Sequence, residues 1–403
     1  MNSIATQLRN IYNDLIPLLD QERYDPATSS SLFKGPWGAL LFMFYYEQYA
    51  DQEVDNAVPL LQKLHASYTP HNGLDFSFCT GHTGPFWLLE HLNRHEFLEM
   101  DIDSLTTEFI SAAIEQSQLH LQWKNFDFLH GCTGMSNFLL PFSAKQEVRA
   151  HLEFMVRQLL AASKVTPQGR SLPIFFTPEQ PAGTYVDAFS LAHGSCAALI
   201  LLAKIYRAGI AEVTCKQLIT ECISFILQHK IPLSGTGLHA MYPAILDGKP
   251  GNANSRLAWC YGDLNVAWTL WYCGKVLDEK SWMNEALEIM HYNTRRFTNE
   301  TAGVIDNCIC HGSSGIAAFY RKFWFETGDT SFYECATHWQ NKATELIAFS
   351  EEDGKHGIRV WQGKDKFWDY SWDLLDGGSG VGLSLLSHLQ DRPLPWDECF
   401  LLS

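Results

Sequence analysis

Two segments of the sequence carry side chains that are common ligands of zinc. Residues 256–262 read RLAWCYG, and residues 308–312 read CICHG. If both segments face the same side of the fold, Cys260, Cys310 and His311 supply two thiolates and one imidazole, a set that binds zinc and leaves a fourth position open for water or substrate. The spacing is not that of a zinc finger, and free cysteines are commonly buried as small apolar residues. Spacing alone therefore leaves metal binding and core packing both open.

The chain has eleven cysteines, an odd number at irregular intervals, which does not indicate a disulfide framework. The N-terminal residues lack the continuous apolar core of a signal peptide, so we expect a reducing, cytoplasmic location. Cys308 is a spare candidate for the metal. The others lie mostly in apolar runs and are expected in the core: Cys79, Cys132, Cys196, Cys215, Cys222, Cys273, Cys335 and Cys399.

Composition excludes several classes of protein. Of 403 residues, 46% are apolar and 18% charged, enough apolar residues for a large core. Lys and Arg number 29 against 45 Asp and Glu, and the net charge of -16 would repel nucleic acid. No run approaches the roughly 18 to 20 apolar residues that span a bilayer.

The segments with candidate ligands belong to a repeat. A glycine pair or its remnant precedes an apolar run seven times, with first glycines 46, 50, 63, 68, 50 and 65 residues apart, room in each unit for two helices. Ala197 and Asn265 replace the second glycine in the fourth and fifth units. The first glycines are Gly35, Gly81, Gly131, Gly194, Gly262, Gly312 and Gly377.

The runs that follow the glycines are apolar on most of their circumference, which predicts buried helices. Segments with one apolar stripe lie between them and predict outer helices at 103–122, 145–162, 214–229, 279–297 and 330–349. Alternating buried and amphipathic helices predict an all-α fold, an α/α toroid in a single domain over residues 1–403. Helix N-termini would then meet at one mouth, where their partial positive charge favours a thiolate or an enolate.

Two connections depart from this plan. Residues 163–187 and 231–256 are rich in Pro, Gly or Asn and too irregular for helix, so we expect long loops or a little strand structure. A lid and a small subdomain both fit this composition.

The motifs WCYG at 259–262, CHG at 310–312 and AHG at 192–194, with the glycine units in this order, resemble the lanthionine synthetase C family over essentially the whole chain. The resemblance implies a toroid of seven inner and seven outer helices. It also implies one zinc ion per chain, on Cys260, Cys310 and His311. In bacterial members it implies addition of a cysteine thiol to dehydroalanine or dehydrobutyrine, which closes a lanthionine or methyllanthionine ring.

The same resemblance implies four catalytic residues. His193 matches a proposed acid/base, Asp127 an aspartate that acts with it, and Arg256 and Tyr261 occupy the places of an active-site Arg and Tyr. Zinc would deprotonate a thiol whose ordinary pKa is about 8.5. Arg256 could then stabilise the enolate oxygen, and a protonated His193 could deliver a proton to the α-carbon.

Other histidines are given structural roles: His82, His130 and His239.

Two alternatives stay open. A protein prenyltransferase also activates a peptide thiol with zinc in a helical toroid, but it needs a carboxylate ligand and a basic patch, neither of which the sequence indicates. A family member that binds glutathione or another thiol without cyclase activity would need the same ligands.

The partners implied by the resemblance are a dehydrated precursor peptide with leader and core, a lanthipeptide dehydratase and an export transporter. A complex with the last two would place the chain peripherally at the inner membrane. Leader recognition is expected on the two irregular connections.

Overall fold

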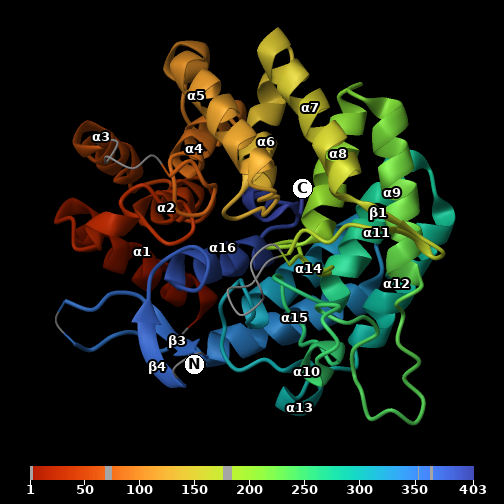
Figure 1. Ribbon diagram of the computed structural model, residues 1–403. Coiled ribbons are helices and arrows are strands. Elements are labelled where there is room, and N and C mark those ends of the chain that lie inside the picture. The colour runs from red at the N-terminus through yellow and green to blue at the C-terminus, as the bar shows by residue number, and fades with distance from the viewer. Residues whose placement is uncertain (1–2, 69–74, 176–183, 353, 364–365) are drawn as a thin grey trace. The chain divides into compact units, whose positions relative to one another are not determined.

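The computed structural model describes residues 3–68, 75–175, 184–352, 354–363 and 366–403. The described chain is mostly helical, with two short antiparallel hairpins, as Figure 1 shows. This confirms the all-α class predicted from the repeats. Among the described residues no helix is both long and apolar enough to cross a membrane.

Each of the seven glycine units leads into a helix that is buried along most of its length, as predicted from the apolar runs. A Cβ atom at Gly315 would lie 2.0 Å from the carbonyl oxygen of Ile309, so the glycine lets the helix begin against the preceding loop. The buried helices are α2 (Pro36–Tyr49), α4 (Thr83–Arg94), α6 (Cys132–Leu139), α8 (Ser195–Arg207), α11 (Asp263–Leu277), α14 (Ser313–Thr327) and α16 (Gly378–His388).

Seven further helices bury one face only. All five predicted amphipathic segments are among them, but α12 ends at Asn293 and α15 at Glu345, each four residues earlier than expected. After α12 the chain turns, and Arg296 forms hydrogen bonds with Asp263 and with the carbonyl of Ser255. The amphipathic helices are α1 (Ile4–Asp20), α3 (Ala57–Ser67), α5 (Ile102–Gln122), α7 (Gln146–Ala162), α9 (Glu212–Leu227), α12 (Lys280–Asn293) and α15 (Thr330–Glu345).

The irregular connections hold the remaining elements. Strand structure at 163–187 is confirmed by the hairpin of β1 (Lys164–Thr166) and β2 (Gly169–Ser171), although 176–183 lie outside the described residues. We expected no helix at 231–256. This prediction is wrong for one turn, α10 (Pro250–Ala253), because a helix of four residues is too short to leave a periodic pattern. The hairpin of β3 (Ile358–Gln362) and β4 (Phe367–Ser371) was not expected. The other short helices are η1 (Pro26–Thr28), η2 (Leu140–Phe142), α13 (Asn299–Ala302) and η3 (Pro395–Phe400).

The chain divides into two compact units. The first comprises Met1–Thr106, Val304–Cys399 and Ser403, and the second Thr107–Gly303 and Phe400–Leu402. In the first, α14 packs on α15 and α16 on α2; in the second, α11 packs on α12 and α8 (Figure 1). The single domain expected from the sequence stays a prediction.

A repeated turn precedes the buried helices. In six units the side chain four residues before the first glycine accepts a hydrogen bond, 2.7–3.3 Å long, from the N–H of the residue just before that glycine. In the fifth unit Ala258 stands at the acceptor position, and Gly262 has a φ of +93°, which favours glycine. The six pairs are Ser31 and Lys34, Ser77 and Thr80, Asp127 and His130, Ser190 and His193, Cys308 and His311, and Asp373 and Asp376.

We call the residue just before the first glycine the pre-glycine residue. His193 and His311 are the pre-glycine residues of the fourth and sixth units, and Tyr261 is that of the fifth. Three of the seven predicted site residues therefore occupy one equivalent place in the repeat.

Candidate metal and acid–base site

In the second of the two compact units, His193 and Asp127 lie next to each other. Nδ1 of His193 lies 2.7 Å from Oδ2 of Asp127, and the side chains are 27% and 18% exposed. Oδ1 of the same carboxylate accepts the N–H of His130 at 2.7 Å. One oxygen of Asp127 thus holds the repeated turn and the other orients the imidazole. Nε2 of His193 has no hydrogen-bond partner among the described residues, so this nitrogen is available to exchange a proton with a ligand.

The surroundings of His193 favour its charged form. Burial alone would lower the pKa of the imidazole, but the hydrogen bond and the charge of Asp127, together with a Cys260 thiolate, raise that pKa above its usual value. His193 is therefore suited to hold a proton near neutral pH.

Aromatic rings surround the imidazole. The ring centroids of Tyr261 and Phe175 lie 6.1 and 6.3 Å from that of His193, and His130 stacks at 6.1 Å with an interplanar angle of 15°. Tyr261 was predicted to lie at this site. Phe175 was not, and His130 was expected to be structural only. Phe175 lies in the irregular connection, where no sequence signal pointed to it, whereas His130 is recognisable as a pre-glycine residue.

Cys260 is 6% exposed in a firmly held loop. Its carbonyl accepts a hydrogen bond from the Ser190 hydroxyl. Nε1 of Trp259 donates to the carbonyl of Phe400 at 2.9 Å, and Nε1 of Trp268 to that of Leu401 at 2.8 Å. The last residues of the chain therefore help to fix the loop that carries Cys260.

A buried ion pair supports the same loop from its other end. Nη1 of Arg296 lies 3.0 Å from Oδ2 of Asp263, and the two side chains are 4% and 0% exposed. Asp263 also accepts the N–H groups of Met241 and Tyr242, and Arg296 donates to the carbonyl of Ser255 at 2.6 Å. A buried pair with its remaining groups satisfied fixes geometry, and breaking it is costly. Sequence analysis did not identify this pair.

Arg256 differs from the other predicted site residues of the second compact unit in its exposure to solvent. Its side chain is exposed and forms no ion pair with any residue in the described ranges. Among the described residues, the guanidinium forms no hydrogen bond with His193, Asp127 or Tyr261. The role of Arg256 stays a prediction.

In the first of the two compact units, Cys310 and His311 lie close to Asp376. One ligand atom of each lies within 4.8 Å of the other two. Oδ2 of Asp376 pairs with Nζ of Lys34 at 2.9 Å, whereas Oδ1 is buried and has no hydrogen-bond partner among the described residues. An unpartnered carboxylate oxygen beside a thiol and an imidazole is the donor chemistry that suits zinc. The sequence signal for Asp376 is its pre-glycine place in the seventh unit.

The structure gives Cys308 a role in the turn. Cys308 is fully buried, its Sγ accepts the N–H of His311 at 3.3 Å, and burial raises the pKa of the thiol well above its usual value. Asp306 lies beside it, with Oδ2 3.7 Å from Nε2 of His311. Cys260 belongs to the second compact unit.

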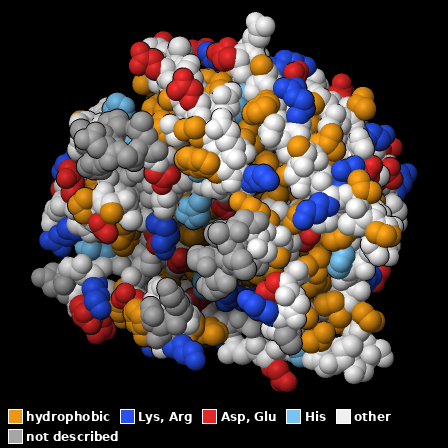
Figure 2. All heavy atoms as spheres, viewed as in Figure 1, with side chains coloured by type: hydrophobic (Ala, Val, Ile, Leu, Met, Phe, Trp, Pro, Cys, Tyr) orange, Lys and Arg blue, Asp and Glu red, His pale blue; other side chains and the backbone are white. Residues whose placement is uncertain are grey.

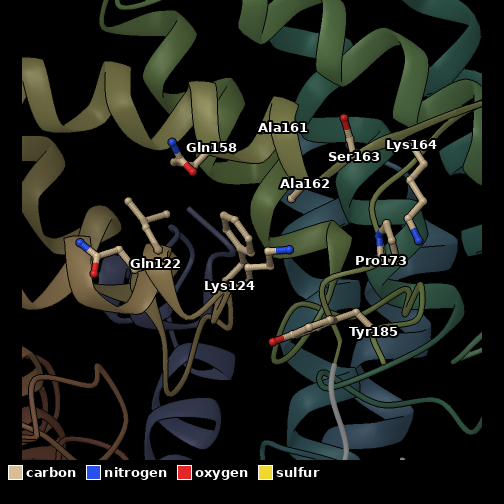
Figure 3. Close-up of a pocket in the computed structure, with 11 residues that line it drawn as sticks. Gln122, Lys124, Gln158, Ala161, Ala162, Ser163, Lys164, Pro173 and Tyr185 are labelled. Carbon is tan, nitrogen blue, oxygen red and sulfur yellow. The ribbon is translucent and has the colours of Figure 1, made fainter. Parts of the chain in front are cut away.

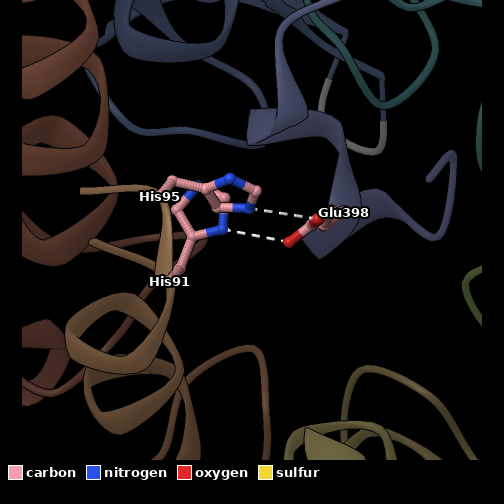
Figure 4. A group of neighbouring side chains, drawn as sticks. All are labelled: His91, His95 and Glu398. Carbon is pink, nitrogen blue, oxygen red and sulfur yellow. Dashed lines mark hydrogen bonds and ion pairs between the residues drawn. The ribbon is translucent and has the colours of Figure 1, made fainter. Parts of the chain in front are cut away.

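A separate cluster of potential ligands lies in the first unit at His91, His95 and Glu398 (Figure 4). Its groups already have partners: Glu398 accepts a hydrogen bond from Arg94 at 2.7 Å, and His91 contacts the Tyr45 hydroxyl at 3.0 Å. Burial lowers the pKa of His91 to about 4, so its imidazole is neutral. We interpret this cluster as a set of contacts that holds η3 in place. The carbonyl of Phe400, at the end of η3, accepts the hydrogen bond from Trp259.

The charged surface agrees with the composition. Figure 2 shows Lys and Arg side chains dispersed among Asp and Glu on the face drawn, without a basic patch there.

Comparison with known proteins gives one family. The model of the family described as lanthionine synthetase C-like protein matches residues 26–401. No curated protein matches the sequence. Nisin cyclase is similar in structure, with a TM-score of 0.70 and 18% identity, over 98% of this chain and 97% of that one. This likeness shows the fold and confirms the predicted α/α toroid class.

Two other solved structures are more distant. An unsaturated glucuronyl hydrolase specific for heparin has a TM-score of 0.49 and 10% identity, over 96% of each chain. A sugar epimerase from a ruminal bacterium has a TM-score of 0.42 and 11% identity, over 97% of this chain and 100% of that one.

Proposed function

Because the chain belongs to the lanthionine synthetase C-like family, we propose that it is a zinc-dependent lanthipeptide cyclase. Its substrate is a dehydrated precursor peptide, in which a cysteine thiol adds to dehydroalanine or dehydrobutyrine. One observation carries the proposal: the Asp127–His193 pair is built to hold a proton beside Cys260 and leaves Nε2 of His193 open.

The ligands proposed for zinc are Cys260, Cys310 and His311. The buried, unpartnered oxygen of Asp376 lies beside Cys310 and His311 and supports these two ligands, whereas Cys260 is proposed from its motif alone. When bound, zinc lowers the pKa of a substrate thiol and so supplies a thiolate at neutral pH.

The chain's own residues complete the reaction. Attack of the thiolate on the β-carbon of the dehydro residue forms the C–S bond and moves an electron pair onto the carbonyl as an enolate. His193 then gives the proton on Nε2 to the α-carbon, and Asp127 keeps Nδ1 protonated and oriented. Arg256 is assigned to the enolate oxygen and Tyr261 to a hydrogen bond with the substrate.

The proposal extends to partners. A lanthipeptide dehydratase supplies the dehydrated peptide, and an export transporter removes the product. Association with both would hold the protein peripherally at the inner membrane. Co-purification from cells that express all three tests this part.

Ring closure is tested by incubating the protein with a dehydrated, cysteine-containing peptide and counting free thiols by alkylation and mass spectrometry. We expect a loss of one free thiol per ring. Thiol binding without any loss of free thiol would contradict the cyclase and support a member that only binds thiols.

Metal analysis tests the ligands. Wild-type protein is expected to hold about one zinc per chain, and Cys260→Ala and Cys310→Ala to lose it. Cys215→Ala, which alters a buried thiol assigned to the core, is the control and keeps the metal. Full zinc in both ligand variants would contradict the assignment.

A further inference from the structure

A small pocket of about 30 Å³ lies in the first compact unit, between the C-terminal parts of α14 and α16 and residues 393–397. A space of this volume holds one ligand of about the size of a water molecule. Cys310 and His311 precede the N-terminal end of α14, whereas the pocket lies towards the other end of that helix. The pocket is therefore separate from the candidate metal site.

Arg321, which lines this pocket, is a buried cation without a carboxylate partner. It is 6% exposed and forms no ion pair with any other described residue. Its Nη2 donates to the carbonyl of Gln390, whereas Nε and Nη1 have no hydrogen-bond partner in the described ranges. Its Cζ lies 5.4 Å from the ring centroid of Trp324 and 4.8 Å from that of Phe325. These rings attract the cation, but they do not neutralise its charge.

The acidic groups near Arg321 do not compensate this charge. Burial lowers the pKa of Arg321 to about 10, so the guanidinium is still charged at neutral pH. Asp391 is exposed and acts on it only through its charge. Asp397 lines the pocket, but it pairs with Lys322 at 3.8 Å and accepts a hydrogen bond from the Ser403 hydroxyl. One positive charge is left over, and a buried charge without a counter-charge is costly.

Ser387, the second polar group of this argument, lines the same pocket from the last turn of α16. Its Oγ accepts a hydrogen bond from Nε1 of Trp396 at 2.7 Å, and its own hydrogen has no acceptor among the residues that the structure describes. A cation with a free N–H group and a hydroxyl with a free hydrogen therefore line one small pocket. Such a pair suits a ligand that is negative and only accepts hydrogen bonds.

A larger pocket in the second compact unit shows why the burial of Arg321 matters. Its volume is about 530 Å³, and Figure 3 shows Lys124 and Lys164 on opposite sides of it. Both lysines are exposed, so water solvates their charges and no bound counter-ion is needed. Arg321 lacks this access to water, and moving a charge out of water is unfavourable unless another charge pairs with it.

We propose that the pocket beside Arg321 binds a chloride ion, which pairs with the guanidinium and accepts a hydrogen bond from the Ser387 hydroxyl. The volume admits a monatomic anion but not phosphate or sulfate. A water molecule would fill the space and leave the charge uncompensated. The ion connects α14 and α16 to the segment that forms the start of η3, so its binding stabilises the folded chain. This site goes beyond the proposed function, because neither zinc nor a peptide takes part in it.

Thermal unfolding of the full-length protein tests chloride binding. Sodium gluconate, whose anion is too large for the pocket, is replaced stepwise by sodium chloride at constant pH and ionic strength. We expect the midpoint to rise by about 1 to 3 °C for each tenfold increase in chloride concentration once the site begins to fill. The same midpoint in every mixture would overturn the proposal.

A variant assigns the effect to Arg321. Arg321→Met keeps a long, unbranched side chain on the helix and removes the charge, so its midpoint should not depend on chloride. Arg23→Met is the matched control, because Arg23 is an exposed arginine of the same compact unit and does not line the pocket. This control should respond to chloride like the wild type. An undiminished response in Arg321→Met would contradict the assignment.

Bromide locates the ion in the wild-type protein and does not depend on whether the variant folds. Crystals grown with sodium bromide should give an anomalous peak between the Arg321 guanidinium and the Ser387 hydroxyl. Water at this position, without an anomalous peak, would show that the pocket is only hydrated and the proposal is wrong. A peak without any chloride dependence of the midpoint would mean an adventitious ion only, and would also overturn it.

Discussion

Replacing Asp127 by Asn tests the acid–base assignment sharply, because the two carboxylate oxygens have different tasks. In Asp127→Asn, Oδ1 can still accept the N–H of His130 and keep the repeated turn. The amide nitrogen then faces Nδ1 of His193, where an acceptor stood before. A neutral imidazole must place its proton on Nε2, and the charged imidazole loses its partner.

The size of the effect follows from the contact. A hydrogen bond of 2.7 Å to a charged group contributes about 1.5 to 3 kcal/mol, and partial exposure of both side chains, 27% and 18%, favours the lower part of that range. A loss of about 1.5 to 2.5 kcal/mol corresponds to a rate about 10- to 70-fold lower at about 1.4 kcal/mol per factor of ten.

The pH dependence gives a second readout. The pKa of His193 is raised, so the protonated fraction, and with it the rate, falls as the pH rises through that pKa. Removing the Asp127 charge moves this fall to lower pH. The same pair contributes to folding stability below the unfolded pKa of histidine, and that contribution is lost as the pH rises through the folded pKa.

The assay is free-thiol loss from a dehydrated peptide, measured across pH together with zinc content. Asp278→Asn is the matched control, because Asp278 is exposed and its left-handed backbone, with φ of 58°, accepts asparagine. An Asp127→Asn rate within about twofold of wild type, with the same pH dependence, would refute the acid role of His193. Loss of zinc along with activity would show that Asp127 acts on the fold instead.

Three further predictions concern the supports of the site. Asp263→Ala should lower the free energy of unfolding in urea by about 3 to 5 kcal/mol, because it leaves the Arg296 charge buried alone, and a loss below about 1 kcal/mol would contradict this account. Asp376→Asn should weaken zinc retention against a chelator by about 10- to 100-fold as a neighbour of the ligands, whereas equal retention would exclude such a role. Gly315→Ala should lower the free energy of unfolding by about 1 to 3 kcal/mol, because the added Cβ meets the Ile309 carbonyl, while Ala197→Gly should not raise it. The midpoints of urea unfolding of both variants test this prediction.

Much of the fold could be predicted from the sequence because the relevant signals are local. Seven glycine units and their apolar runs gave the buried helices, and one-sided apolar stripes gave the helices between them. The β3–β4 hairpin escaped prediction, since five-residue strands leave little periodicity. The ends of α12 and α15 were placed too late because contacts outside each helix decide where it stops.

The sequence by itself determined the kinds of chemistry available: cysteine and histidine at the glycine units, and a chain too acidic for nucleic acid. Only the tertiary structure decided which side chains meet. Asp127 and His193 are 66 residues apart in the chain, and no local pattern fixes a contact over that separation. The tertiary structure also decided that Arg256 is exposed and that His130 and Phe175 lie around the His193 imidazole. It placed one buried oxygen of Asp376 beside Cys310 and His311. Glycine patterns and helical periods act between near neighbours, whereas burial and the convergence of charges depend on the packing of the folded chain.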